Sequence, residues 1–198
     1  MSTVLLTENS SDLWETPRYL IETIESLWGK LNFDLAADGH NAKYPNYFGE
    51  LDNSLVQDWR GKRGLLNPPY GKKGPGEWLR KCVETEQRRI RKTDCVVAIV
   101  KAATDSKWWH KYVMLATEIA FVEGRMIFIP PPDYAPPMDS KTGKRHFTGN
   151  NHGTALVYFG EQTDPDQICD GPIMRTISPK HVREFKLENY LHNCKEVA

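Results

Sequence analysis

The chain has 198 residues, its 26 Lys and Arg are balanced by 26 Asp and Glu, and 39% of its residues are hydrophobic. This length suits one compact domain that buries roughly 70% of the surface its unfolded chain exposes. The longest apolar runs are far shorter than the ~20 residues that cross a bilayer, and no secretory leader is recognisable, so we expect neither a membrane nor a secreted protein. A net charge of zero also excludes a uniformly basic protein that coats nucleic acid, so contact with a polyanion requires a local patch.

The cysteines stand singly, without a CxxC pair or a histidine at metal-ligand spacing. They are Cys82, Cys95, Cys169 and Cys194. This pattern disfavours a zinc site, and we expect no metal. A chain with ample core does not need disulfides, so we expect reduced thiols and a cytoplasmic protein.

The character of the chain changes near residue 12. Residues 1–11 are rich in Ser and Thr and lack a hydrophobic period, so we expect a flexible N-terminus followed by one domain over 12–198. Apolar residues then recur at helical spacing. They predict a helix over 17–28, with Thr16 as its N-cap and Pro17 in the first helical position.

Further along the chain, apolar strand-like runs alternate with helical patterns. The expected strands cover 32–36, 64–66, 95–101, 125–129 and 154–159. The expected later helices cover 77–91, 106–116 and 179–192. This alternation predicts an α/β fold with a mostly parallel sheet, helices on both of its faces and an antiparallel last strand.

The most specific motif is Asn67-Pro68-Pro69-Tyr70-Gly71, which directly follows an expected strand. Each proline holds the residue before it in an extended conformation, so the motif predicts a stiff loop. The side-chain oxygen of Asn67 and the backbone oxygen of Pro68 can then accept both hydrogens of one NH2 group. Such a contact stabilises the positive charge that grows when a delocalised, weakly nucleophilic amine is alkylated.

Tyr70 adds a flat aromatic face to this loop. Stacking of a base on an aromatic ring is worth ~1–3 kcal/mol, similar to the few kcal/mol needed to pull a base out of a duplex. The motif therefore favours a site that holds an extruded base by its amine and its face. The alternative is that the motif is only a strand-ending turn with a packed tyrosine.

The motif resembles the catalytic loop of amino methyltransferases that depend on S-adenosylmethionine. Over residues 12–160 the chain resembles the phage-type DNA N6-adenine methyltransferase (Dam-like) family. Besides the motif, the resemblance is carried by residues 12–17, 33–37 with Asn41, Asp58-Trp59, and 105–109. It implies a single Rossmann-like methyltransferase domain that transfers a methyl group from S-adenosylmethionine to the exocyclic N6 amine of adenine in DNA.

The resemblance also implies roles for individual residues. The catalytic residues would be Asn67, Pro68, Pro69 and Tyr70. The residues that bind the methyl donor would be Trp14, Thr16, Pro17, Asp34, Ala36, Ala37, Asn41, Asp58 and Asn67. An acid that follows the second strand normally holds the donor ribose, and the candidates are Glu50 and Asp52. Asp58 is equally well interpreted as an exposed loop aspartate.

The DNA contacts are expected in an inserted loop over 130–153, which is rich in Pro, Gly and basic residues. No separate recognition domain fits in the remaining length. The candidate contacts are Lys141, Lys144, Arg145 and, at the carboxyl end of the strand 95–101, Lys101. Double-stranded DNA in the cytoplasm of a bacterial or phage-infected cell is the implied partner.

Two other functions remain open at this point. The same motif occurs in enzymes that methylate adenine in RNA or a glutamine amide in protein, and these share the chemistry but not the substrate. A non-catalytic DNA-binding protein that retains the methyltransferase fold is the second alternative, although the intact motif argues against it.

Overall fold

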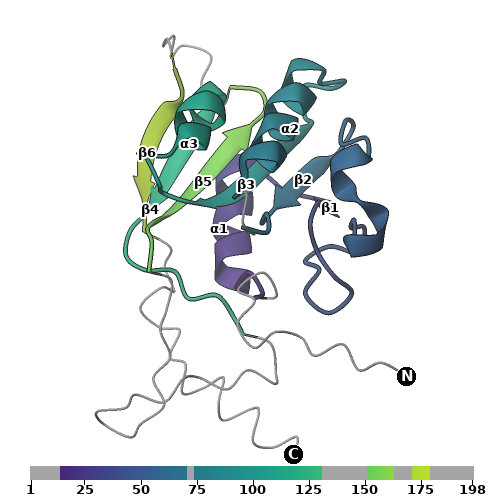
Figure 1. The fold of residues 1–198 in the computed structure, drawn as a ribbon, viewed down its shortest axis with the longest axis horizontal. Helices are drawn as coiled ribbons and strands as arrows, with labels where there is room; N and C mark the ends of the chain where they lie inside the picture. Colours follow the sequence, from purple (N-terminus) through teal and green to yellow (C-terminus); the bar gives the residue numbers. More distant parts are fainter. Residues whose placement is uncertain (1–13, 71–73, 131–150, 163–170, 179–198) are drawn as a thin grey trace, which may run out of the picture.

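The computed structural model of the chain describes residues 14–70, 74–130, 151–162 and 171–178. Within these ranges, six strands form one mixed sheet in the order β1-β2-β3-β5-β4-β6 (Figure 1). The strands are β1 (Phe33–Asp34), β2 (Arg63–Leu66), β3 (Cys95–Lys101), β4 (Glu118–Val122), β5 (Thr154–Phe159) and β6 (Ile173–Ile177). Only β5 runs against the other strands, because its pairings with β3 and β4 are antiparallel and the remaining pairings are parallel. The predicted mostly parallel sheet, with an antiparallel strand at Thr154–Phe159, is confirmed.

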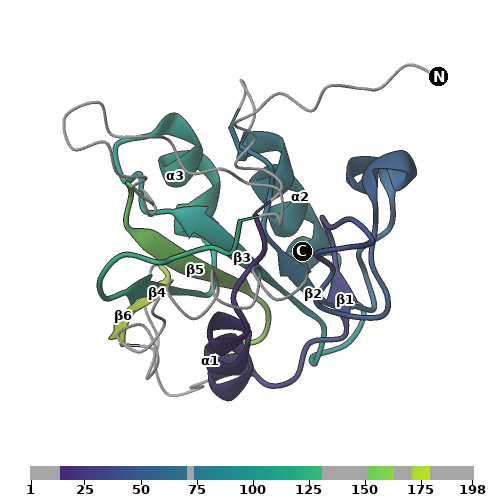
Figure 2. The ribbon, with the colours of Figure 1, turned by 90° about the horizontal axis from the view of Figure 1, so that it is seen from below.

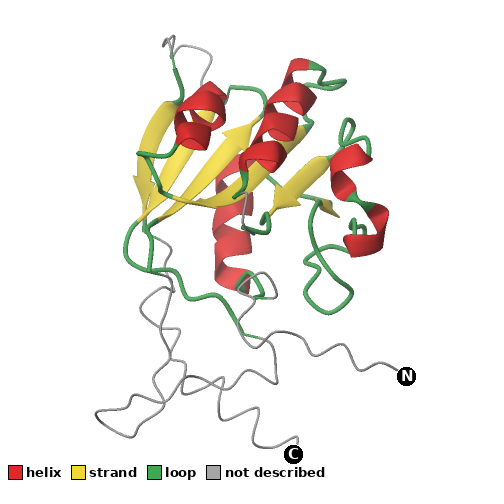
Figure 3. Cartoon of the chain, in the orientation of Figure 1, coloured by secondary structure: helices red, strands yellow, loops and turns green. Residues whose placement is uncertain are grey.

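Helices cover both faces of this sheet, as predicted. They are α1 (Arg18–Trp28), α2 (Gly76–Gln87) and α3 (Lys107–Tyr112), with short 3-10 turns η2 (Glu50–Asp52), η3 (Ser54–Val56) and η4 (Val113–Leu115). Figure 2 shows α1 on one side of the sheet and α2 with α3 on the other, and Figure 3 shows the same layers coloured by element type. The molecule is therefore an α/β sandwich of three layers.

The apolar run of the central strand β3 is continuous because both faces of the strand are buried. Val97 and Ile99 pack into the core beneath α1, whereas Val96, Ala98 and Val100 pack into the core beneath α2 and α3. Side chains alternate between the faces of a strand, so a strand covered on both faces needs apolar residues at every position.

One predicted strand is wrong. The expected strand at 125–129 forms only an isolated bridge between Ile129 and Glu15, and the sheet is instead built with β4 seven residues earlier along the chain. Gly124, at a φ of 81°, follows β4 and turns the chain before the apolar run begins. That run is apolar because Met126 is fully buried in the core. Strand β6 was not predicted, since its burial alternates and only Ile173 is buried.

The helix ends differ slightly from expectation. Pro17, not Thr16, is the N-cap of α1, and α2 ends at Gln87 rather than at residue 91. The Ser106 hydroxyl caps α3 by accepting a hydrogen bond from the backbone N–H of Trp109 at 3.4 Å. The predicted flexible residues 1–11 and the predicted helix 179–192 lie outside the described residues, so the extent of the domain remains a prediction.

Two of the cysteines, Cys82 and Cys95, are buried free thiols. Burial raises the pKa of both, that of Cys95 to about 11. Cys169 and Cys194 lie outside the described residues. No helix in the described ranges is long and apolar enough to cross a membrane.

Candidate active site

The Asn67-Pro68-Pro69-Tyr70 loop begins where β2 ends, at the carboxyl end of the strand. The parallel strands β1, β2 and β3 all end at this edge of the sheet. Figure 2 views the molecule toward this edge, which the segment before α1 crosses. Open α/β sheets bind ligands at the carboxyl ends of their strands, so the loop lies where the fold favours a site.

Tyr70 is held against the end of β3. Its hydroxyl oxygen accepts a hydrogen bond from the backbone N–H of Lys101 at 2.5 Å. This N–H is available because β2 ends at Leu66, which pairs with Ala98, so the last residues of β3 extend past their neighbour. Burial raises the pKa of the Tyr70 hydroxyl, which keeps it neutral. The hydroxyl thus accepts the hydrogen bond that a longer β2 would otherwise accept, and this contact fixes the far end of the loop.

Asn67 is held at the near end of the loop by the segment before α1. Its side-chain nitrogen donates a hydrogen bond to the hydroxyl oxygen of Thr16 at 3.3 Å. Thr16 is buried, and the backbone of its neighbour Glu15 exchanges two hydrogen bonds with Ile129. In the described part of the chain Nδ2 is the only partnered end of the Asn67 amide, which leaves Oδ1 available to an external donor.

The family resemblance predicts methyl transfer at this loop, and we expect Thr16→Val to lower the rate of that transfer by about fivefold, the value of one hydrogen bond, because the Asn67 amide loses the contact that orients it. Thr16→Ser keeps the hydroxyl and should retain the wild-type rate. Single-turnover rates of both variants, with their melting temperatures, check this. Equal rates for Thr16→Val and the wild type would contradict an orienting role for Thr16.

Asp34 closes the loop that follows β1. Its buried carboxylate accepts hydrogen bonds from the backbone N–H groups of Ala36 at 3.3 Å and Lys43 at 3.1 Å. Burial raises the pKa of Asp34, and these hydrogen bonds oppose the rise. The Asp34 side chain therefore holds the backbone of the predicted donor loop in place through these hydrogen bonds.

The rest of the donor loop is also tied to itself and to its neighbours. The Asp38 carboxylate accepts hydrogen bonds from the backbone N–H of Asn41 and, at 2.8 Å, from its side-chain nitrogen. Lys43 forms an ion pair with Glu15, which joins the loop to the segment that holds Thr16. Glu15 thus connects the donor loop with the Asn67 anchor.

A further backbone segment extends the sheet beyond β1. Asp34 forms a parallel bridge with Tyr47, and the backbone N–H of Ala37 donates to the carbonyl oxygen of Phe48 at 3.1 Å. Glu50 and Asp52 follow this segment, as the ribose-binding acid is expected to follow a second strand. The Asp52 carboxylate accepts a hydrogen bond from the N–H of Gly49 at 2.7 Å. The Glu50 carboxylate has no hydrogen-bond partner among the described residues, so it is the more available acid.

Asp58 does not join this group. It precedes β2 and therefore lies toward the amino ends of the strands, where it forms an exposed ion pair with Arg60 at 2.7 Å. Hydrogen bonds from Arg60 hold the pKa of Asp58 at about 2. The remaining donor-site candidates are Trp14, half-buried in the segment that crosses the edge, and Pro17, buried at the start of α1.

The predicted DNA contacts Lys141, Lys144 and Arg145, with nearly all of the inserted loop 130–153, lie outside the described residues. Lys101 is described, and its ammonium lies 4.4 Å from the centre of the Tyr70 ring. Among the described residues no group of three His, Cys, Asp or Glu side chains is arranged to hold a metal ion.

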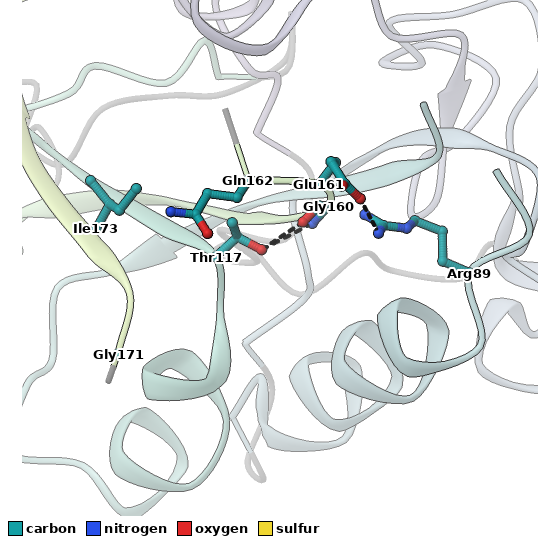
Figure 4. A pocket seen from close by; sticks show the side chains of 7 residues that line it. All are labelled: Arg89, Thr117, Gly160, Glu161, Gln162, Gly171 and Ile173. Atoms are coloured by element: carbon teal, nitrogen blue, oxygen red, sulfur yellow. Dashed lines mark hydrogen bonds and ion pairs between the residues drawn. The ribbon is translucent and has the colours of Figure 1, made fainter. Parts of the chain in front are cut away.

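A pocket of about 310 Å³ opens at the opposite edge of the sheet, near the start of β4 and the end of β5 (Figure 4). Several polar groups that line it contact other protein groups. Arg89 forms ion pairs with Glu86 and Glu161, and the Thr117 hydroxyl donates to the Gly160 carbonyl oxygen at 2.7 Å. None of the predicted site residues lines this pocket.

Comparison of the sequence with known proteins points to one family. The sequence model of the family described as DNA N-6-adenine-methyltransferase (Dam) matches residues 3–181. The DNA N-6-adenine-methyltransferase of Escherichia phage T1 is 27% identical over 166 residues, which cover 76% of this chain and 63% of that protein. The corresponding protein of Haemophilus phage HP1 is 26% identical over 153 residues, which cover 77% of this chain and 80% of that protein.

The match to the phage T1 protein spans less than two thirds of its length, whereas the family model covers nearly the whole of this chain. The matched region contains the Asn67 loop, the donor loop and every strand of the sheet. The chain therefore belongs to the DNA N-6-adenine-methyltransferase (Dam) family.

Proposed function

We propose that this protein is an S-adenosylmethionine-dependent methyltransferase that acts on the exocyclic N6 amine of adenine in DNA. The observation that carries the proposal is the orientation of Asn67. Its amide nitrogen is engaged by Thr16, so its oxygen is left to accept a hydrogen from a substrate amine. Membership of the Dam family and the names of the two phage relatives support the same reaction.

The carboxyl edge of the sheet fits the methyl donor by its chemistry. S-adenosylmethionine supplies an electrophilic methyl group on a sulfonium, together with a ribose diol that an acidic side chain can bind. Glu50 offers a carboxylate for that diol, and the segment preceding it contacts Ala37 of the donor loop. Ala36, Ala37 and the segment 14–17 would line the rest of the donor site.

The substrate side of the site follows from the loop itself. The Asn67 Oδ1 and Pro68 carbonyl oxygens accept the two hydrogens of the adenine amine, which favours a pyramidal nitrogen with an available lone pair. Positive charge then grows on this nitrogen next to two fixed carbonyl dipoles, which stabilise it without reorganising. Tyr70 supplies the stacking surface, and the surplus proton passes to solvent.

The base must leave the duplex to reach this loop, because an amine in a base pair is not accessible to it. We propose that Lys141, Lys144 and Arg145, in the inserted loop 130–153, neutralise DNA phosphates beside the site. The protein would act in the cytoplasm of a bacterial or phage-infected cell, where both the donor and the DNA are present.

The function is tested by incubating the protein with isotopically labelled donor in a mixture of duplex DNA, RNA and denatured cell protein. Each fraction is then digested, and the labelled product is identified by mass spectrometry. The proposal predicts label in N6-methyladenine from DNA. Label in RNA or in a glutamine amide would overturn the choice of substrate. Failure to bind the donor in a calorimeter would instead favour a non-catalytic DNA-binding protein.

A further inference from the structure

We propose that Lys101 is a positioning residue that prepares Tyr70 to stack on the target base from one side only. This inference rests on the proposed function. The Lys101 ammonium lies 4.4 Å from the centre of the Tyr70 ring, over one of its faces. A base that stacks on this tyrosine must therefore take the opposite face.

Lys101 contacts the ring in two independent ways. Its backbone N–H donates to the phenol oxygen at 2.5 Å, and its ammonium covers the ring. The first contact anchors the tip of the side chain to the last residue of β3. The second opposes rotation of the ring about its Cβ–Cγ bond. Together they fix the position and the tilt of the stacking surface.

No carboxylate in the described part of the chain forms an ion pair with Lys101. Its ammonium instead contacts the Tyr70 ring. Cation–π contacts of this kind are strongest when the cation is partly desolvated, and Lys101 is half-buried. The arrangement is made by groups of this chain alone, so it can order the tyrosine before a base binds.

The geometry also distinguishes Lys101 from an ordinary phosphate contact. An ammonium that contacts phosphate contributes to the salt dependence of DNA binding whether or not a base has been extruded. An ammonium that orders Tyr70 instead contributes to the stacking of the base, and this contribution appears only once the base has entered the site. The two roles can therefore be separated by measuring duplex affinity and base stacking on the same variant.

The experiment compares Lys101→Met and Lys101→Arg with the wild type. Methionine keeps the backbone N–H and a similar side-chain length but removes the charge, whereas arginine keeps the charge. Lys62→Met is the matched control, since Lys62 lies over the Phe33 ring at 5.2 Å and the Phe48 ring at 5.7 Å, and it precedes β2 at the end of the strand opposite the Asn67 loop. The readouts are kcat/KM for DNA, KM for the donor, and the fluorescence of 2-aminopurine placed at the target position.

We expect Lys101→Met to lower kcat/KM for DNA by about 3- to 30-fold, the range of a partly desolvated cation–π contact. KM for the donor should not change, and 2-aminopurine should fluoresce more strongly in the complex because it stacks less well. Lys101→Arg should restore both values, and Lys62→Met should match the wild type.

Unchanged fluorescence, combined with weaker duplex binding and a flatter salt dependence, would overturn this role and make Lys101 a phosphate contact. Wild-type values for Lys101→Met in every readout would overturn it as well. If Lys101→Met instead lowers the melting temperature and weakens donor and DNA binding equally, the substitution acts on the fold as a whole, and the positioning role is overturned. If the wild-type protein methylates no DNA, the proposed function itself fails, and that result is visible before any variant is made.

Discussion

Replacing Asn67 by Ala should lower the rate of methyl transfer on the order of 10²–10³-fold, the effect of removing one preorganised stabiliser of transition-state charge. The variant removes Oδ1, which we assign to the substrate amine, and leaves the backbone of the loop intact. Tyr70 remains bonded to Lys101, so the stacking surface should persist. The rate is measured in single turnover, with donor and DNA saturating, so that weaker binding does not enter it.

The control for this variant is Asn32→Ala. Asn32 precedes β1, and its side-chain oxygen accepts a hydrogen bond from the backbone N–H of Arg63 at 3.1 Å. This substitution removes the same chemical group at the other edge of the sheet and should leave the rate within a factor of two, an order-of-magnitude expectation for a group remote from the reacting atoms. Equal rates for Asn67→Ala and the wild type would show that the amide takes no part in the reaction.

The second large effect concerns stability. Glu118→Ala should lower the free energy of unfolding by about 3 kcal/mol, because it leaves the partners of a buried charge unpaired. Glu118 is fully buried in β4, where its carboxylate accepts a hydrogen bond from the Trp28 indole N–H at 2.8 Å and forms an ion pair with Arg175 of β6 at 3.0 Å. One carboxylate thus joins α1 to the outer strand of the sheet. Denaturant unfolding followed by circular dichroism measures the loss.

Glu118→Gln should have a smaller effect, since its side-chain oxygen can still accept from Trp28 but no longer carries the charge that pairs with Arg175. Glu123→Ala is the surface control, because Glu123 is exposed just after β4. Its unfolding free energy should stay within about 0.5 kcal/mol of the wild type. If Glu118→Ala were as stable as Glu123→Ala, the buried contacts of Glu118 would not hold the outer strands.

The fold was predictable where local sequence and burial agree. Strands β3 and β5 match their predicted ranges because nearly every residue of both is buried and each contains a long apolar run. Strand β4 was missed since it begins with Glu118, whose burial depends on Trp28 and Arg175, far away in the sequence. The composition of the apolar run 125–129 predicts a strand, because a segment that buries Met126 in the core has the same composition as one that pairs in a sheet.

The site was predictable only in part, and for a similar reason. The Asn67 loop is recognisable because its chemistry is contained in consecutive residues. The groups that orient it are not local, since Thr16 lies 51 residues before Asn67 and Lys101 lies 31 residues after Tyr70. Likewise, the ion pair of Glu15 with Lys43 spans 28 residues and has no signal in the sequence. Such contacts arise only when the fold brings distant segments together at the carboxyl ends of the strands.

The central claim is that two carbonyl oxygens hold the adenine amine during the reaction. A crystal structure of the protein with a DNA duplex and a donor analogue that cannot transfer its methyl group tests this most directly. It should show an extruded adenine whose N6 lies within about 2.7–3.2 Å of both Asn67 Oδ1 and the Pro68 carbonyl oxygen. An extruded adenine whose amine contacts neither oxygen, or an Asn67 oxygen turned toward Thr16, would contradict it.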